Sequence, residues 1–345
     1  MKSPNKVIES SLKAGSDKSV DRSCNAQTLL SENNEVVSPN LQRSVATDSQ
    51  LKSTNFIKPK KILNISTFNI RSGREDWKIQ ELSQLMDDHN ISMIAIQEHR
   101  RIHEEKIKYE EINNHVLITS SAVRNSAQAA IGGVGLLLNK KASSALCEVT
   151  SISSRIMQAT FAGNPELTLI SVYAPTNCKG NEESAEEFYS QLRDAIGQTP
   201  QHNLLLVLGD FNAKISSAHT RYAHDKRTNE NGVRLVDLSC EKSLIITNNN
   251  LLKKDGKRWT FEDPKRKRYQ LDYVLINSKW KNSVMNVNPH SSFAFVGSDH
   301  TVVKFKLRLS LHMPNSRPLT KRYDWRHLKV DKDLCSRFTL ELKNK

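Results

Sequence analysis

The chain has 345 residues, of which 37% are hydrophobic and 26% are charged, and its formal net charge at pH 7 is +14. This length exceeds that of a small module held together by disulfides or a metal, and it suits one large domain with tails. No apolar run of roughly 18 residues occurs and the N-terminus lacks the apolar centre of a signal peptide, so we expect neither a membrane-spanning helix nor secretion.

The first segment, residues 1–58, is rich in Ser, Asn and Lys and shows no sustained apolar period, which predicts a disordered tail. Five scattered cysteines form no C-x-x-C pair and no zinc-type cluster with histidine. We therefore expect reduced thiols, as in a protein of the nucleus or cytoplasm.

The pattern changes at residue 61. Residues 61–70 alternate and are β-branched, which predicts a buried strand, and residues 91–98 predict a second one. Between them, residues 75–89 predict a helix. Its expected apolar face is formed by Trp77, Ile79, Leu82, Leu85 and Met86. The order strand–helix–strand favours a layered α/β domain.

The remainder of the domain is mostly predicted strand. Continuous β character between about residues 115 and 173 predicts antiparallel hairpins, and residues 181–198 and 229–243 predict helices. The expected strands in this part are 115–121, 132–140, 144–152, 154–162, 167–175, 203–212, 244–248, 257–263, 269–277 and 299–309. Pro and basic residues dominate after Leu311, so we expect a folded domain at 59–311 and a basic linker at 312–345.

Several predicted strands end in polar side chains that could carry chemistry. These are Asn69, Glu98, Tyr173, Asp210, Asn212, Asp272, Asp299 and His300. Any one of them alone is typical of a turn. Strand ends at one edge of an α/β fold converge on a shared crevice, so together they predict a polar cluster. Buried carboxylates are costly unless they are paired or bind a metal.

The residue types in this cluster favour one chemistry. Carboxylates and amides without cysteine prefer a hard cation, Mg²⁺ or Mn²⁺. A histidine beside an aspartate can move a proton near pH 7 or stabilise charge as imidazolium. Together these groups suit hydrolysis of a phosphoester.

Six stretches resemble the endonuclease/exonuclease/phosphatase superfamily, in the order of that family. They are STFNIR (66–71), IQEHR (96–100), VYAPTN (172–177), GDFNA (209–213), QLDYVL (270–275) and GSDH (297–300). The spacing of these motifs is most similar to that in the apurinic-type endonucleases of non-LTR retrotransposons of the RTE-like clade. The stretches NENGVRLVDL (229–238) and SKW (278–280) are also similar to these endonucleases. The resemblance implies a four-layered α/β sandwich in which helices flank two mixed β-sheets, as in DNase I-like proteins.

The resemblance also implies a metal site. By position in the motifs, Glu98 would be the principal ligand of Mg²⁺ or Mn²⁺, with Asn69 beside it and Asp299 assisting.

The same motifs imply catalytic roles. His300 would contact the scissile phosphate and would be oriented by Asp272. Asp210 and Asn212 would position or deprotonate the attacking water, and Tyr173 would stabilise the leaving or a non-bridging oxygen.

Three positions depart from the family pattern. Thr176 stands where the DNA-repair members carry an active-site Asn, so the contact with DNA would be made by Thr176, made by the next residue, Asn177, or lost. Arg71 stands where some repair relatives have an acidic neighbour of the metal, which puts a second metal in doubt. His99 replaces the usual Thr.

Two basic–aromatic stretches, 251–262 and 263–270, precede the strand that carries Asp272. The residues expected to bind DNA there are Lys257, Arg258, Lys265, Arg266, Lys267 and Arg268. A hairpin that follows phosphates is one interpretation, and a solvated hairpin tip or a nuclear-import signal is the other.

We therefore expect a metal-dependent DNA endonuclease that leaves a 3′-hydroxyl nick, which in a retrotransposon would prime reverse transcription. The linker at 312–345 resembles the start of a reverse-transcriptase region, so reverse transcription would need a partner or a missing C-terminal portion. Two alternatives remain: another phosphoesterase of the superfamily, or a domesticated DNA- or chromatin-binding protein without catalysis.

Overall fold

The computed structural model describes residues 56–309 and 329–343, except 179, 255, 291, 292, 294 and 296. The tail predicted for residues 1–58 therefore lies outside the described residues up to position 55. Phe56 and Ile57 already lie in the hydrophobic core, each with 3% of its surface exposed. The packed chain thus begins before the expected boundary at 59.

The first sheet has seven strands in the order β16-β17-β1-β2-β7-β4-β3. Their bounds are β16 Val284–Pro289, β17 Val303–Arg308, β1 Ile62–Asn69, β2 Met93–Gln97, β7 Val134–Asn139, β4 His115–Ser120 and β3 Ile107–Ile112. The β1–β2 pair is parallel and the other neighbours are antiparallel.

The second sheet has six strands in the order β12-β15-β11-β10-β9-β8. Their bounds are β12 Leu244–Ile246, β15 Asp272–Asn277, β11 Leu204–Asp210, β10 Leu167–Tyr173, β9 Ile156–Phe161 and β8 Leu146–Ser153. Here β10 and β11 are the parallel pair. The antiparallel pairing of β8 with β9 and of β9 with β10 confirms the predicted hairpins.

The main hydrophobic core lies between the two sheets. Along β10 and β11, alternate side chains such as Leu169 and Leu206 enter this core, whereas Ile170 and Val207 face the helices on the other side. This explains why the sequence of β11 is an almost continuous apolar run and that of β10 is mainly apolar, since both faces of each strand are buried.

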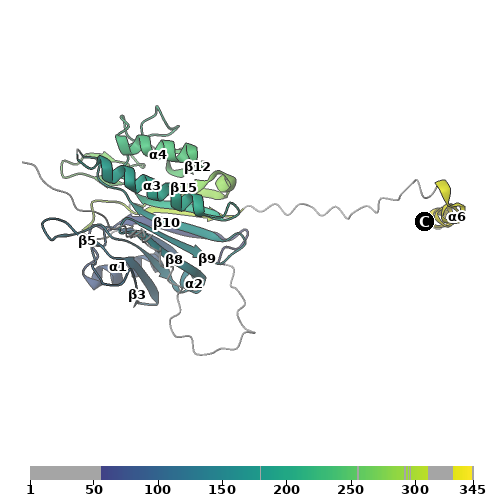
Figure 1. The fold of residues 1–345 in the computed structure, drawn as a ribbon, viewed down its shortest axis with the longest axis horizontal. Coiled ribbons are helices and arrows are strands. Elements are labelled where there is room, and N and C mark those ends of the chain that lie inside the picture. Colours follow the sequence, from purple (N-terminus) through teal and green to yellow (C-terminus); the bar gives the residue numbers. More distant parts are fainter. Residues whose placement is uncertain are drawn as a thin grey trace, which may run out of the picture. The chain divides into compact units, whose positions relative to one another are not determined.

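Helices cover the outer faces of both sheets (Figure 1). Helix α1 (Asp76–Asp88) packs on the first sheet, and α3 (Glu182–Gln198) and α4 (Glu230–Glu241) pack on the second. The molecule is therefore a four-layered α/β sandwich, as expected. The remaining elements are α2 Lys140–Ser144, β5 Val123–Arg124, β6 Ala130–Ile131, β13 Phe261–Glu262, β14 Arg268–Tyr269, η1 Thr247–Asn249, η2 Ser278–Ser283 and α6 Lys332–Lys343.

Some elements differ from the predictions. Trp77 is 51% exposed, because two residues of helix place it on the side opposite to buried Ile79. The strand expected at 257–263 is reduced to the two residues of β13, and β3 and β16 were not predicted. Residues 312–328 and 344–345 of the expected linker lie outside the described residues, as do the last two residues of the expected domain, and the rest of the linker contains α6.

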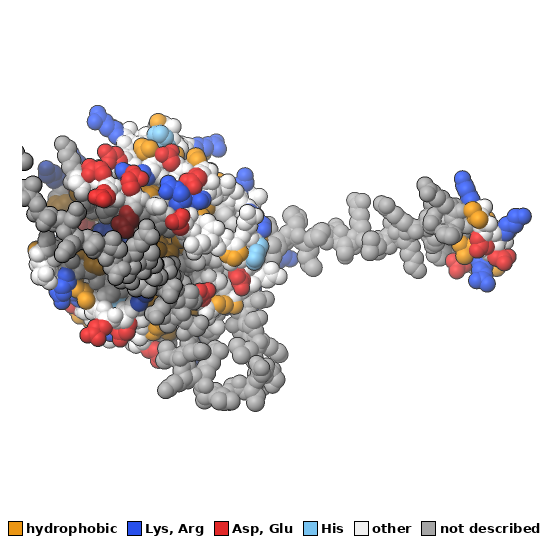
Figure 2. Space-filling model, viewed as in Figure 1, with side chains coloured by type: hydrophobic (Ala, Val, Ile, Leu, Met, Phe, Trp, Pro, Cys, Tyr) orange, Lys and Arg blue, Asp and Glu red, His pale blue; other side chains and the backbone are white. Residues whose placement is uncertain are grey.

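The surface over α3 and α4 carries acidic and basic side chains close together (Figure 2). Arg193 pairs with Glu241 and Arg234 with Glu186, each at 2.7 Å, and both pairs join the two helices. No helix in the described part of the chain is long and apolar enough to span a membrane.

Candidate active site

The predicted polar residues meet at one edge of the sandwich. Asn69 ends β1 and Glu98 follows β2, and these are the two parallel strands of the first sheet. In the second sheet, Asp210 ends β11 and stands opposite Asp272, the first residue of β15. Because each sheet has its parallel pair ending at this edge, residues far apart in sequence converge there.

Gly209 allows β11 to approach β10 closely. A Cβ atom built on Gly209 would lie 1.9 Å from the carbonyl oxygen of Val172, its partner on β10. Any side chain would therefore push the strands apart and displace the next pair in register, Tyr173 and Asp210. The glycine of the GDFN motif is explained by this contact.

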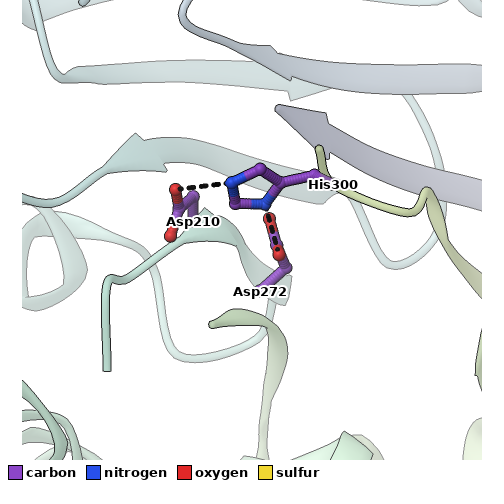
Figure 3. A group of neighbouring side chains, drawn as sticks. All are labelled: Asp210, Asp272 and His300. Carbon is purple, nitrogen blue, oxygen red and sulfur yellow. Dashed lines mark hydrogen bonds and ion pairs between the residues drawn. The ribbon is translucent and has the colours of Figure 1, made fainter. Parts of the chain in front are cut away.

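His300 lies between two carboxylates (Figure 3). Its Nδ1 donates a hydrogen bond to Asp272 Oδ2 at 2.9 Å, and its Nε2 is 3.8 Å from Asp210 Oδ2. Burial opposes the charged ring, but the negative charges of Asp272, Asp210 and Asp299 outweigh it and raise the pKa of His300 to about 9. The ring is therefore an imidazolium at neutral pH.

Asp210 is a group that can exchange a proton near neutral pH. Burial, together with the charge of Asp272, raises the pKa of Asp210 to about 7, although His300 and hydrogen bonds oppose the rise. The backbone N–H of Asn212 donates to Asp210 Oδ1 at 2.8 Å, and Asn69 Nδ2 donates to Oδ2 at 3.0 Å. These bonds fix the carboxylate without removing its capacity to act as a base.

Asn69 connects the two halves of the site. Its amide nitrogen donates to Glu98 Oε1 and to Asp210 Oδ2, each at 3.0 Å. Its Oδ1 accepts from the backbone N–H of Arg71 at 2.9 Å, and Ser298 Oγ donates to its carbonyl at 2.7 Å. In this arrangement Asn69 positions the carboxylates, with its own side-chain oxygen turned towards Arg71.

Glu98 is ionised and partly accessible. Burial opposes its charge, but hydrogen bonds from Arg100, Asn69 and Tyr173 outweigh burial and lower the pKa of Glu98. Burial and the nearby charge of Glu98 raise the pKa of Tyr173, so its phenol remains a donor. Arg155 lies 5.1 Å from the centre of the Tyr173 ring and donates to its carbonyl at 3.3 Å.

Glu98 and Asp299 offer the type of donor that a hard divalent cation prefers. Their side chains are 17% and 30% exposed, and carboxylate oxygens are what Mg²⁺ and Mn²⁺ prefer. A second group, Asp210, Asp272 and His300, also has donor atoms within 4.8 Å of one another. That group is a poor metal site, because an imidazolium whose nitrogens both face carboxylates has no lone pair to give.

The departure at His99 has a structural role. The ring is fully buried, its Nε2 lies 3.0 Å from the carbonyl of Ser120, and its Nδ1 accepts from the N–H of Arg101 at 3.0 Å. Burial lowers the pKa of His99 to about 4, so the ring is neutral. These bonds hold the turn in which Glu98 and Arg100 both adopt left-handed backbone angles, φ +53° and +56°.

Asn177 is held by the NENG segment. Its Oδ1 accepts from the backbone N–H of Asn231 at 3.1 Å, and Asn231 Nδ2 donates to the carbonyl of Pro175 at 2.8 Å. Asn229 Nδ2 likewise donates to the carbonyl of Asn212 at 2.9 Å. Sequence reasoning assigned no role to Asn229 or Asn231, although Asn229, the N-cap of α4, carries a recognisable capping signal.

The predicted DNA-binding hairpin, β13–β14, adjoins the site. The rings of Phe261 and His300 are 4.9 Å apart, and the N–H of Thr301 donates to the carbonyl of Thr260 at 2.7 Å. Thr260 Oγ1 also accepts from the N–H of Asp272 at 3.1 Å. The hairpin therefore shares its base with the strands that carry the Asp272–His300 pair.

The basic residues of this region are not equivalent. Arg266 and Arg268 both pair with Glu262, at 3.1 and 2.8 Å. Arg258 is partly buried and donates to two backbone carbonyls, those of Ala223 and Lys253. The side chains of Lys257, Lys265 and Lys267 are exposed, and within the described residues they have no hydrogen bond or ion pair.

Comparison with known proteins finds relatives named craniofacial development protein 2. The chain is 28% identical over 302 residues to craniofacial development protein 2 of Bos taurus, covering 85% of this chain and 49% of that protein. It thus spans about half the length of the curated relatives it matches.

Two solved structures share the fold. One is the AP endonuclease LMAP of Leishmania major, with a TM-score of 0.59, 13% identity, and coverage of 74% of this chain and 90% of that one. The other is the endonuclease domain of TRAS1, a telomere-specific non-LTR retrotransposon, with a TM-score of 0.50, 18% identity, and coverage of 72% and 99%. The sequence profile of the Endonuclease/Exonuclease/phosphatase family matches residues 66–300, more than half of the chain and all six motifs. The chain therefore belongs to the Endonuclease/Exonuclease/phosphatase family.

Proposed function

We propose that this protein is a divalent-metal-dependent DNA endonuclease that leaves a 3′-hydroxyl nick. The observation that supports this most is the imidazolium of His300 between Asp272 and Asp210, beside the accessible carboxylates of Glu98 and Asp299. In this crevice Asp210 would be the base, His300 the cationic donor, and Glu98 and Asp299 the cation ligands, and phosphodiester hydrolysis needs these three functions.

In the proposed reaction Asp210 takes a proton from water, whose oxygen bonds to phosphorus as the P–O3′ bond breaks, and the departing O3′ oxygen takes a proton from solvent. The products are a 3′ hydroxyl and a 5′ phosphate. His300 stabilises the negative charge that develops on a non-bridging oxygen, and Asp272 keeps its ring protonated and oriented. Tyr173 stays protonated and donates to a leaving or non-bridging oxygen, and Asn212 positions the water. A divalent cation at Glu98 and Asp299, with Asn69 beside it, supplies charge to the phosphate when bound.

The biological role proposed is nicking of target DNA so that the 3′ hydroxyl primes reverse transcription. It rests on the resemblance of the NENGVRLVDL and SKW stretches to retrotransposon endonucleases. A reverse transcriptase supplied by a longer element would be the partner, and action on target DNA would require the protein to be in the nucleus.

The chemistry of the 3′ end provides the test. A duplex oligonucleotide is incubated with the full chain in Mg²⁺ or EDTA, and the cut strand is then offered to a DNA polymerase. We expect Mg²⁺-dependent cuts that the polymerase extends directly. Asp210→Asn should lower the cutting rate by about 10² to 10⁴, as expected for loss of a general base.

Asp237→Asn is the matched control, because Asp237 is an exposed carboxylate on α4. Cut strands that the polymerase extends only after phosphatase treatment would contradict the proposed end chemistry. DNA binding without any cutting would instead support the non-catalytic binding protein.

A further inference from the structure

Two arginines pair with the carboxylates expected to hold the cation. Arg100 Nη2 lies 2.6 Å from Glu98 Oε2, and Arg71 Nη1 lies 3.5 Å from Asp299 Oδ2. Both arginines belong to left-handed turns directly after strand ends, with φ +56° at Arg100 and +59° at Arg71. The chain thus brings two guanidinium groups to the crevice itself.

The two pairs differ in how firmly they are held. Arg100 is 32% exposed and makes a short, charge-assisted hydrogen bond. Arg71 is 58% exposed, and its 3.5 Å separation from Asp299 is too long for a strong hydrogen bond. Its backbone, in contrast, is fixed by the 2.9 Å bond from its N–H to Asn69 Oδ1. Arg71 is therefore anchored at its base while its guanidinium is available to another anion.

An anion that enters the crevice needs a cationic partner there. Two cations of the crevice, His300 and Arg100, are already held by hydrogen bonds to Asp272 and Glu98, respectively. A phosphodiester entering between Glu98 and His300 adds a negative charge to a crevice already rich in carboxylates. Of the two guanidinium groups that pair with these carboxylates, that of Arg71 is held less firmly than that of Arg100.

We propose that Arg71 binds the scissile phosphodiester, exchanging Asp299 for a non-bridging phosphate oxygen when substrate enters. The planar guanidinium presents paired donors that match phosphate oxygens, which an ammonium group does not. Arg71 then shares with His300 the stabilisation of charge on the phosphate. This role rests on the proposed endonuclease function and adds a substrate-binding residue to it.

The first test measures binding and does not depend on catalysis. DNA affinity is measured against salt concentration in Ca²⁺, using full-length Asp210→Asn protein with and without Arg71→Ala. Losing one phosphate contact should make the negative slope of log affinity against log salt shallower by about 0.9. Arg308→Ala is the matched control, because Arg308 is exposed at the end of β17 that pairs with the start of β1, away from Asn69. An unchanged slope for Arg71→Ala would overturn the proposal.

The second test measures turnover in Mg²⁺ with Asp210 intact. Arg71→Ala should lower kcat by about 10²-fold, as for removal of one donor to a developing anion. Arg71→Lys should recover part of that loss. If wild-type protein binds DNA but never cuts it, the endonuclease proposal fails, while the salt slope still decides whether Arg71 binds phosphate. Full kcat in Arg71→Ala would overturn the proposal for Arg71 alone.

Discussion

The chemistry at the residue scale depends on neighbours that no single motif contains. Ser-Asp-His at 298–300 indicates a carboxylate beside an imidazole, yet the carboxylates that set the charge of His300 include Asp210 and Asp272, from two other strands. From the sequence, the grouping of His300 with Asp210 and Asp272 could be predicted only from the order of the family motifs. The sequence could not predict that Arg100 pairs with Glu98, because that contact depends on left-handed backbone angles at both residues.

The pH dependence of cleavage follows from the same neighbours. The pKa of Asp210 is raised to about 7 and that of His300 to about 9, so kcat/KM should rise through pH 7 and fall above pH 9. The rise comes from ionisation of the base, and the fall comes from loss of the imidazolium proton.

Asp272→Asn tests the cause, because the charge of Asp272 raises both pKa values. Both limbs of the profile should move to lower pH in this variant. The profile is measured as cleavage of a labelled duplex at low substrate concentration. An upper limb that stays near pH 9 would show that Asp272 does not hold the proton on His300.

Elements with a strong pattern could be predicted from the sequence, and edge elements could not. β2, β10 and β11 are buried on both faces and are mainly apolar, and β1 has an alternating, β-branched pattern. By contrast, β3 (IKYEEI) and β16 (VMNVNP) lie at opposite edges of the first sheet and have few buried residues. Their mixed composition carries no clear period, so only pairing with a neighbour defines them.

The hairpin β13–β14 gives a prediction at this scale. Lys265 and Lys267 are exposed without ion pairs among the described residues, whereas Glu262 already neutralises part of Arg266 and Arg268. We expect Lys265→Ala/Lys267→Ala to reduce the salt slope of DNA binding by nearly two, and Arg266→Ala/Arg268→Ala to reduce it less.

The control for this pair is Lys60→Ala/Lys61→Ala, which removes the same charge just before β1, at the opposite end of that strand from Asn69. Equal slopes for the lysine pair and this control would indicate that the hairpin is only a solvated tip.

At the scale of the whole molecule, the four layers serve to bring two parallel strand pairs to one edge. The order strand–helix–strand predicted a layered α/β domain, and the family resemblance supplied the number of layers. The register that sets Asp210 opposite Asp272 could not be predicted from either strand alone. It results from pairing between segments about 60 residues apart, where short-range pattern carries no information.

The most direct measurement is nicking of supercoiled plasmid by the full chain, in Mg²⁺ and in EDTA, beside Glu98→Ala and His300→Ala. Circular dichroism would confirm that each variant is folded. The account predicts nicking that EDTA abolishes and that each substitution lowers by about 10²-fold or more. Nicking that persists in EDTA, or that both variants retain at the wild-type rate, would contradict a cation-assisted centre built from Glu98 and His300.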